Sequence, residues 1–256
     1  MRGHTRWVNG VTHFPDGRRI ITCSSDGSLR LWDLKSGTQI GEDWRDENPG
    51  VWSMALSPNG EIVASGCDDG KVRLWDVETR KVMGKLTGHT KVVFALCWSA
   101  DGERVASGSG DGTATIWDVK RRENILTIKT GHTWVRATMR GHTDWVNGVA
   151  HLPDGRRIIT CSSDGSLRLW DLKSGTQIGE DWRDENLGIF SMALSPNGEI
   201  VASGCGYGKL RLWDVETRKV MGKCMGHITI VSALCWSADG ERVASGYWDG
   251  IARVWD

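Results

Sequence analysis

The sequence lacks the features that mark membrane, nucleic-acid-binding and secreted proteins. No run of about 18 apolar residues could cross a bilayer, and the N-terminus has no apolar signal-peptide core. The 32 basic and 32 acidic residues give a net charge of zero, so no long-range field attracts nucleic acid or anionic lipid. These absences predict a compact domain that binds neither membranes nor nucleic acid.

The seven cysteines form neither an even set nor a metal-binding motif. Cys-x-x-Cys is absent, and no two His or Cys residues stand at ligand spacing, so we expect neither a disulfide framework nor a metal site. Cys23, Cys67, Cys161 and Cys205 stand among apolar residues of expected strands. We therefore expect buried thiols and a reducing, cytoplasmic location.

What the sequence does contain is a repeat. The dipeptide Trp-Asp recurs at intervals of 43, 42, 53, 43 and 42 residues, beginning at Trp32, Trp75, Trp117, Trp170, Trp213 and Trp255. A Gly-His pair precedes four of these dipeptides by about thirty residues, beginning at Gly3, Gly88, Gly141 and Gly226. This pattern resembles the WD40 repeat family, whose fold is a β-propeller of radially arranged four-stranded blades.

The residues between the motifs indicate strands. Short runs rich in Val, Ile and Leu, such as residues 61–65 and 71–75, are bounded by Pro-Asn-Gly and similar turns. No segment has apolar residues at helical spacing over 11 or more positions. We predict an all-β fold, with residues 1–256 forming a single WD40 β-propeller domain of six blades.

The last repeat ends after its third expected strand, so we expect a sixth blade without its outer strand. An open strand edge accepts other strands. The alternatives are therefore a place in a seven-bladed ring, or a ring closed by another chain, and the edge offers a route to homo-oligomers.

The sequence also contains a duplication longer than a single blade. Residues 1–118 match residues 139–256 at 98 of 118 positions without a gap. The chain is thus two three-blade copies, residues 1–138 and 139–256. A surplus Gly-His at Gly131 lengthens the third interval by ten residues, and we expect residues 131–140 to be a protruding or mobile insertion.

The WD40 resemblance implies a structural tetrad in the four Gly-His repeats. The His donates a hydrogen bond to a turn Asp, and the indole of the motif Trp donates one to a strand hydroxyl. The four sets are His4, Thr22, Asp26 and Trp32; His89, Ser107, Asp111 and Trp117; His142, Thr160, Asp164 and Trp170; and His227, Ser245, Asp249 and Trp255. Blades two and five lack the Gly-His pair, and we expect them to be less well braced.

These tetrads contain the residue types of a Ser-His-Asp catalytic triad, which is recognised by geometry and not by residue type. A catalytic site is needed once, whereas this set occurs four times, so we predict a structural role and no enzyme activity. The segment Gly66–Lys71 is one residue too short for a phosphate-binding loop and is followed by Val72 in place of Ser or Thr. We expect no cofactor.

Differences between the two copies gather on one face. The propeller arrangement places the loops before each first strand and between the second and third strands together, whereas the turns of the opposite face match between the copies. The differing pairs are Arg6 and Asp144, Asp68 and Gly206, Asp69 and Tyr207, Thr90 and Ile228, Lys91 and Thr229, Ser109 and Tyr247, and Gly110 and Trp248. Loops on a rigid scaffold carry function, so this face is the expected binding surface.

Large aromatics at exposed loop positions are typical of interface hot spots, although packing against neighbouring loops is the alternative. We predict that a protein partner contacts Arg6, Lys91, Asp144, Tyr207, Tyr247 and Trp248. Near-identical WD40 repeats with one variable face also resemble the C-terminal recognition domains of fungal NOD-like (STAND) receptors. The predicted function is therefore a non-enzymatic protein-recognition or scaffold module.

A lectin-like propeller that binds glycans or other small ligands is the alternative function. Trp44 and Trp182, in the repeated segment Gly-Glu-Asp-Trp-Arg-Asp-Glu of the expected outer strands, could stack on sugar rings.

Overall fold

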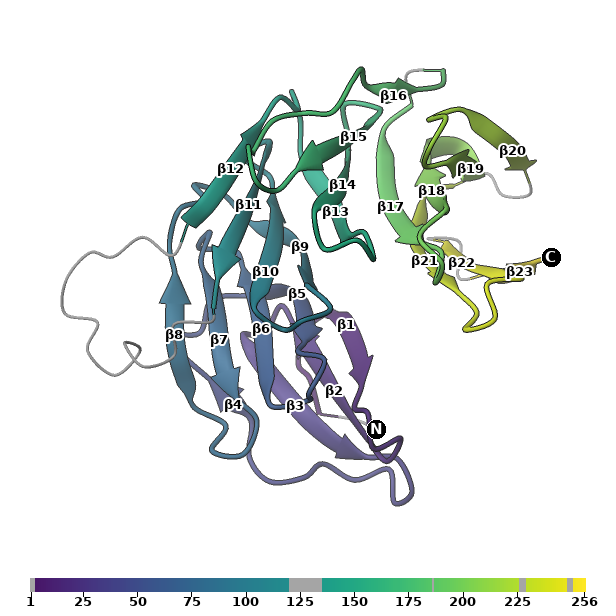
Figure 1. Cartoon of the computed structure of the whole chain (residues 1–256). Helices are drawn as coiled ribbons and strands as arrows, with labels where there is room; N and C mark the ends of the chain where they lie inside the picture. The colour runs from purple at the N-terminus through teal and green to yellow at the C-terminus, as the bar shows by residue number, and fades with distance from the viewer. Residues whose placement is uncertain (1–2, 120–134, 186, 226–228, 248–250) are drawn as a thin grey trace. The chain divides into compact units, whose positions relative to one another are not determined.

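The computed structural model describes residues 3–119, 135–185, 187–225, 229–247 and 251–256. Within these residues the regular structure consists of β-strands and one three-residue 3-10 turn, arranged as six antiparallel sheets (Figure 1). Five of these sheets have four strands and the last has three. The predicted all-β fold of six blades, with an incomplete sixth, is confirmed.

The strands follow one another in chain order. The first sheet contains β1 (Val8–His13), β2 (Arg19–Ser24), β3 (Ser28–Asp33) and β4 (Trp44–Arg45). The second contains β5 (Val51–Leu56), β6 (Ile62–Cys67), β7 (Val72–Asp76) and β8 (Val82–Leu86). The third contains β9 (Val93–Trp98), β10 (Arg104–Ser109), β11 (Thr113–Asp118) and β12 (Val135–Arg140).

The second copy repeats this order. The fourth sheet contains β13 (Val146–His151), β14 (Arg157–Ser162), β15 (Ser166–Asp171) and β16 (Trp182–Arg183). The fifth contains β17 (Ile189–Leu194), β18 (Ile200–Cys205), β19 (Lys209–Asp214) and β20 (Val220–Met225), with the 3-10 turn η2 (Gly206–Gly208) between β18 and β19. The sixth contains β21 (Val231–Trp236), β22 (Val243–Tyr247) and β23 (Ala252–Trp255).

The chain divides into two compact units. One comprises Met1–Asp111 and Thr115–Thr138, and the other comprises Gly112–Ala114 and Met139–Asp256. The change after Thr138 falls where the two sequence copies meet.

The core of each unit lies between neighbouring sheets. In the first unit, apolar side chains of β2 and β3 pack with those of β5, β6 and β7, around Leu29, Val51 and Trp75. In the second unit, the equivalent cluster surrounds Leu167, Ile189 and Trp213. The second and third strands of blades one to four are mostly buried, whereas β23 of blade six is mostly exposed. The four cysteines expected in strands are buried free thiols.

In blades one and four, a bulge at the start of the first strand connects the blade to the next one. Pairing of β1 with β2 shifts between Val8 and Gly10, and the amide of Asn9 at this bulge donates to the Val51 carbonyl oxygen of the next blade at 2.7 Å. In the second unit, the Asn147 amide donates to the Ile189 carbonyl oxygen at 2.9 Å. These bonds fix the loops at one end of the blades.

Part of the expected insertion at 131–140 is a strand. Residues 135–140 are β12, which lies beside β11 at the edge of the third sheet (Figure 1). The segment alternates Val, Ala and Met with Arg and Thr, which is the two-residue period of a strand, and Met139 is buried. Residues 131–134 lie outside the described residues.

Candidate recognition face

The recognition face consists of the loops that precede the first strand of each blade and the turns that join its second and third strands. The tetrads connect these loops and turns to the strands. In blade one, Nδ1 of His4 lies 2.9 Å from Oδ2 of Asp26 and its Nε2 lies 2.8 Å from the Thr22 hydroxyl. The Trp32 indole donates to the same hydroxyl at 2.9 Å. A neutral imidazole protonated on Nδ1 satisfies every group in this chain of bonds.

The same network recurs in blades three and four. Nε2 of His89 lies 2.7 Å from the Ser107 hydroxyl, which accepts from the Trp117 indole at 2.8 Å. Its Nδ1 lies 3.1 Å from Asp111. In blade four the joined residues are His142, Thr160, Asp164 and Trp170, at 2.7 to 2.9 Å. In blade six the Trp255 indole donates to Ser245 at 2.7 Å, whereas His227 and Asp249 lie outside the described residues.

Burial decides against a catalytic reading of these sets. The hydroxyls of Ser107 and Thr160 belong to fully buried residues in the middle of a sheet, and each also accepts an indole N–H. A nucleophile must reach its substrate and needs donors placed for the developing oxyanion. The networks therefore connect the loop, the turn and the third strand of a blade, as braces.

The glycine of the Gly-His pair also has a packing role. A Cβ on Gly3 would lie 2.0 Å from Nη1 of Arg30, and one on Gly141 would lie 2.2 Å from Nη1 of Arg168. The two guanidiniums also bind Asp43 and Asp181, at 2.8 and 2.9 Å. A side chain at either glycine would therefore force the end of the arginine side chain to move away from its carboxylate partner.

Two of the tetrad carboxylates, of Asp26 and Asp164, are held in their ionised form. Burial, the largest single effect, raises the pKa of Asp26, but hydrogen bonds from Ser28, Thr5 and His4 outweigh it and leave the pKa well below its usual range. For Asp164, hydrogen bonds from His142 and Ser166 likewise overcome the effect of burial. Asp26 and Asp164 thus carry a full negative charge at neutral pH.

Blades two and five lack the His network, as their sequences indicated, and carry an ionic cluster at the same place. In blade two the buried Arg73 guanidinium binds Asp46 at 2.8 Å, Asp69 at 2.9 and 3.1 Å, and Glu47 at 3.2 Å. Lys85 binds Asp46 as well, at 2.8 Å. Charge-assisted bonds are stronger than neutral ones, so this ionic cluster replaces the missing His network.

Blade five carries the same cluster with one member changed. Arg211 binds Asp184 and Glu185, but Tyr207 stands where blade two has Asp69. Without that carboxylate, Nη1 of Arg211 donates to Sγ of Cys205 at 3.1 Å. The Tyr207 side chain is 74% exposed, and its φ of +58° lies in the left-handed region, which is unfavourable for a bulky residue.

The other predicted contact residues divide into three groups. Arg6 and Lys91 are exposed on the first unit, and Asp144 is exposed on the second. Tyr247 is only 6% exposed, because it ends β22 and its hydroxyl accepts from Ser245 at 3.2 Å. The prediction that Tyr247 is a surface contact is therefore wrong. Trp248 lies outside the described residues.

Two exposed tryptophans on this face escaped the comparison of the copies. Trp7 is 75% exposed in the loop before β1, and Trp145 is 50% exposed in the loop before β13. They occupy the same position in the two copies, so a search for differences passes over them. Their position directly after the Gly-His loop was the sequence signal that could have identified them.

The tryptophans proposed for sugar stacking are core residues. Trp44 and Trp182 are 1% and 2% exposed, and they pack against Trp75 and Trp213 with ring centroids 6.3 Å apart in both pairs. They are buried because the short strands β4 and β16 turn the indoles toward the next blade. The suggested role of Trp44 and Trp182 in glycan stacking is therefore wrong.

The described residues contain no group of three His, Cys, Asp or Glu side chains placed to hold a metal ion. In the part of the chain covered by the structure, no helix is long and apolar enough to cross a membrane.

Comparison with known proteins agrees with the repeat pattern. The family model described as "WD domain, G-beta repeat" matches residues 1–33, 42–76, 80–118, 133–171, 181–214 and 218–256. The chain is also similar to "Small ribosomal subunit protein RACK1y" of Oryza sativa subsp. japonica, with 29% identity over 267 residues that cover 100% of this chain and 76% of the relative. Each match ends at the third strand of one of the six sheets.

Proposed function

The chain belongs to the WD40 family, and we propose that it is a non-enzymatic recognition or scaffold module that binds a protein partner through its recognition face. The observation that carries this proposal is Tyr207. A large aromatic that is mostly exposed, at a positive φ that is costly for tyrosine, gives no evident benefit to folding. Strain of this kind persists at functional positions, and tyrosine is favoured at interface hot spots.

Neighbouring residues on each unit support the proposal. Trp7 and Trp145 add exposed indole surface, while Arg6 and Lys91 place positive charge on the first unit and Asp144 places negative charge on the second. Isolated exposed apolar residues are ordinary, but aromatics next to charges on loops braced by buried networks are typical of a binding surface.

Three further features belong to this proposal. The near-identical copies with a variable face support the resemblance to the recognition domains of fungal NOD-like receptors. The seven free thiols support a reducing, cytoplasmic location. The edge of β23, which has β22 as its one neighbour among the described strands, could pair with another copy, and sedimentation velocity would detect such an oligomer.

The test compares three forms of the chain as immobilised bait. Proteins captured by the wild-type chain are identified by quantitative mass spectrometry, and their Kd values are measured after purification. Tyr207→Asp installs the residue that the first copy carries at this position. It should weaken the binding of a true partner by about tenfold or more. Lys35→Ala, an exposed change on the opposite face, is the matched control.

The small ribosomal subunit is a defined first probe, because the rice relative is named as one of its proteins. Co-sedimentation that Tyr207→Asp abolishes would identify a partner of the face. The proposal fails if every captured protein binds wild type and Tyr207→Asp equally well.

A further inference from the structure

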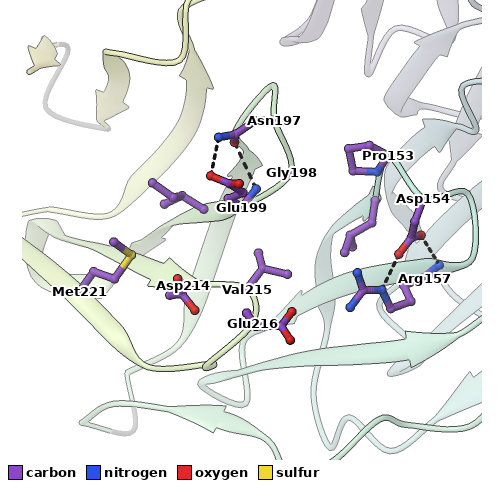
Figure 2. Close-up of a pocket in the computed structure, with 12 residues that line it drawn as sticks. Pro153, Asp154, Arg157, Asn197, Gly198, Glu199, Asp214, Val215, Glu216 and Met221 are labelled. Atoms are coloured by element: carbon purple, nitrogen blue, oxygen red, sulfur yellow. Dashed lines mark hydrogen bonds and ion pairs between the residues drawn. The ribbon is translucent and has the colours of Figure 1, made fainter.

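The second unit has a groove on the face opposite to the recognition face. Its volume is about 650 Å³, and it lies where blades four and five meet (Figure 2). Three turns form its walls: the turn between β13 and β14, the turn between β17 and β18, and the turn between β19 and β20. All three belong to one unit.

The lining of the groove is partly apolar. Met221 contributes exposed apolar surface, while Leu152 and Val215, which are 3% and 5% exposed, form the buried floor. Methionine is a flexible and polarisable side chain that adapts to different ligands. The groove can therefore cover an aliphatic side chain.

The lining is also strongly acidic. It has four carboxylates, of Asp154, Glu199, Asp214 and Glu216, and a single guanidinium, of Arg157. Arg157 is already bound to Asp154 (Figure 2). Backbone hydrogen bonds from Thr217 and its neighbours lower the pKa of Asp214, so it is ionised at neutral pH.

Two of these carboxylates are available to a ligand. Glu216 is exposed, and it forms no ion pair within the described part of the chain. Glu199 is also exposed and accepts one hydrogen bond, from the Asn197 amide at 2.8 Å, which leaves further acceptor sites on the carboxylate. The charge that complements this surface is positive.

The first copy offers an internal comparison. Eleven of the 12 lining residues are identical at the matching positions, and the one change is Phe14 in place of Leu152. The Phe14 ring lies 4.6 Å from the guanidinium carbon of Arg19, a cation–π contact. Leu152 is smaller and offers no ring, so the second copy differs at the buried floor of the groove.

We propose that this groove binds a basic linear segment of a protein partner, in which an arginine pairs with the free carboxylates and an adjacent aliphatic residue packs on Leu152, Val215 and Met221. Arginine suits the site because its planar guanidinium binds carboxylates through two parallel hydrogen bonds. This is a second site, on the opposite face from the one in the proposed function and independent of it.

The probe is a capped, fluorescein-labelled peptide of sequence Gly-Leu-Arg-Leu-Arg-Gly, titrated by fluorescence anisotropy. Citrulline in place of both arginines keeps the shape and removes the charge. We expect saturable binding of the arginine peptide and at least about tenfold weaker binding of the citrulline peptide. Absence of saturable binding, or equal binding of the two peptides, overturns the proposal.

Matched variants locate the site. Glu199→Gln with Glu216→Gln should weaken binding of the arginine peptide by about tenfold or more. Leu152→Phe introduces the residue that the first copy has at this position, and it should weaken binding of the peptide severalfold. Glu180→Gln with Glu241→Gln changes the net charge equally at exposed positions outside the groove, and should have little effect. Equal weakening by both double variants would mean non-specific attraction and overturn the site.

Tyr207→Asp separates this proposal from the proposed function, because it alters the recognition face alone and should leave peptide binding unchanged. Weaker peptide binding by Tyr207→Asp would place the peptide on the recognition face and overturn the groove.

Discussion

Nε2 of His89 lies 2.7 Å from the hydroxyl oxygen of Ser107, and this short contact connects a surface loop to the buried centre of blade three. The Trp117 indole donates to the same hydroxyl. A loop residue, a middle strand and a third strand thus meet at one buried oxygen atom, and the tetrads of blades one and four repeat the arrangement.

His89→Ala should therefore lower the free energy of unfolding by about 1–3 kcal/mol, because buried polar groups lose their partner. Urea denaturation measures the change. His13→Ala, which removes an exposed histidine on β1, is the control and should be close to neutral. A His89→Ala variant as stable as wild type would show that the tetrad does not brace the blade.

Acid should lower the stability of the blades that contain tetrads. The pKa of Asp164 is lowered in the folded state, compared with about 3.9 in an unfolded chain. The contribution of ionised Asp164 to the free energy of unfolding is complete above the unfolded-state pKa. It is lost as the pH falls toward the folded-state pKa. Asp164→Asn should be less stable than wild type at pH 7, and its melting temperature should fall less between pH 5 and pH 3, a window that brackets the usual aspartate pKa. Parallel melting curves for the two proteins would contradict this assignment.

Exchanging residues between blades two and five should have opposite effects on stability. Asp69→Tyr removes two hydrogen bonds to the buried Arg73 guanidinium and should cost about 1.5–3 kcal/mol in the free energy of unfolding. Tyr207→Asp offers Arg211 a carboxylate and places a residue that tolerates positive φ, so it should be neutral or stabilising. Chemical denaturation of both variants measures this difference, and equal losses would show that the two turns are equivalent.

Trp182 should matter for stability and not for sugars. Trp182→Ala should cost about 3–5 kcal/mol, as large-to-small changes in cores do. Trp182→Phe keeps most of the apolar volume and should remain folded. Glycan binding that the wild-type chain shows and folded Trp182→Phe loses would restore the lectin interpretation.

The sequence by itself determined the blades and the tetrads of the Gly-His repeats. Trp32 and Thr22 are ten residues apart on adjacent strands of one hairpin, and His4 and Asp26 close the same blade, so their meeting depends on the order of elements within one repeat. A motif that recurs with each repeat reports such local geometry directly. The six sheets and the hydrogen bonds among the tetrad residues of blades one, three and four follow from it.

Tertiary structure decided the features that depend on what lies beside each residue. Tyr247 and Tyr207 both replace small or acidic residues of the first copy, yet one is buried beside Ser245 and the other is exposed, because the end of a strand and a 3-10 turn orient the side chain differently. Likewise, Arg73 and Asp46 are 27 residues apart, and no recurring motif announces that pair. Only the packing of neighbouring blades could show that Trp44 is core and that a groove lies beside Leu152, because burial is a property of all surrounding elements and not of one repeat.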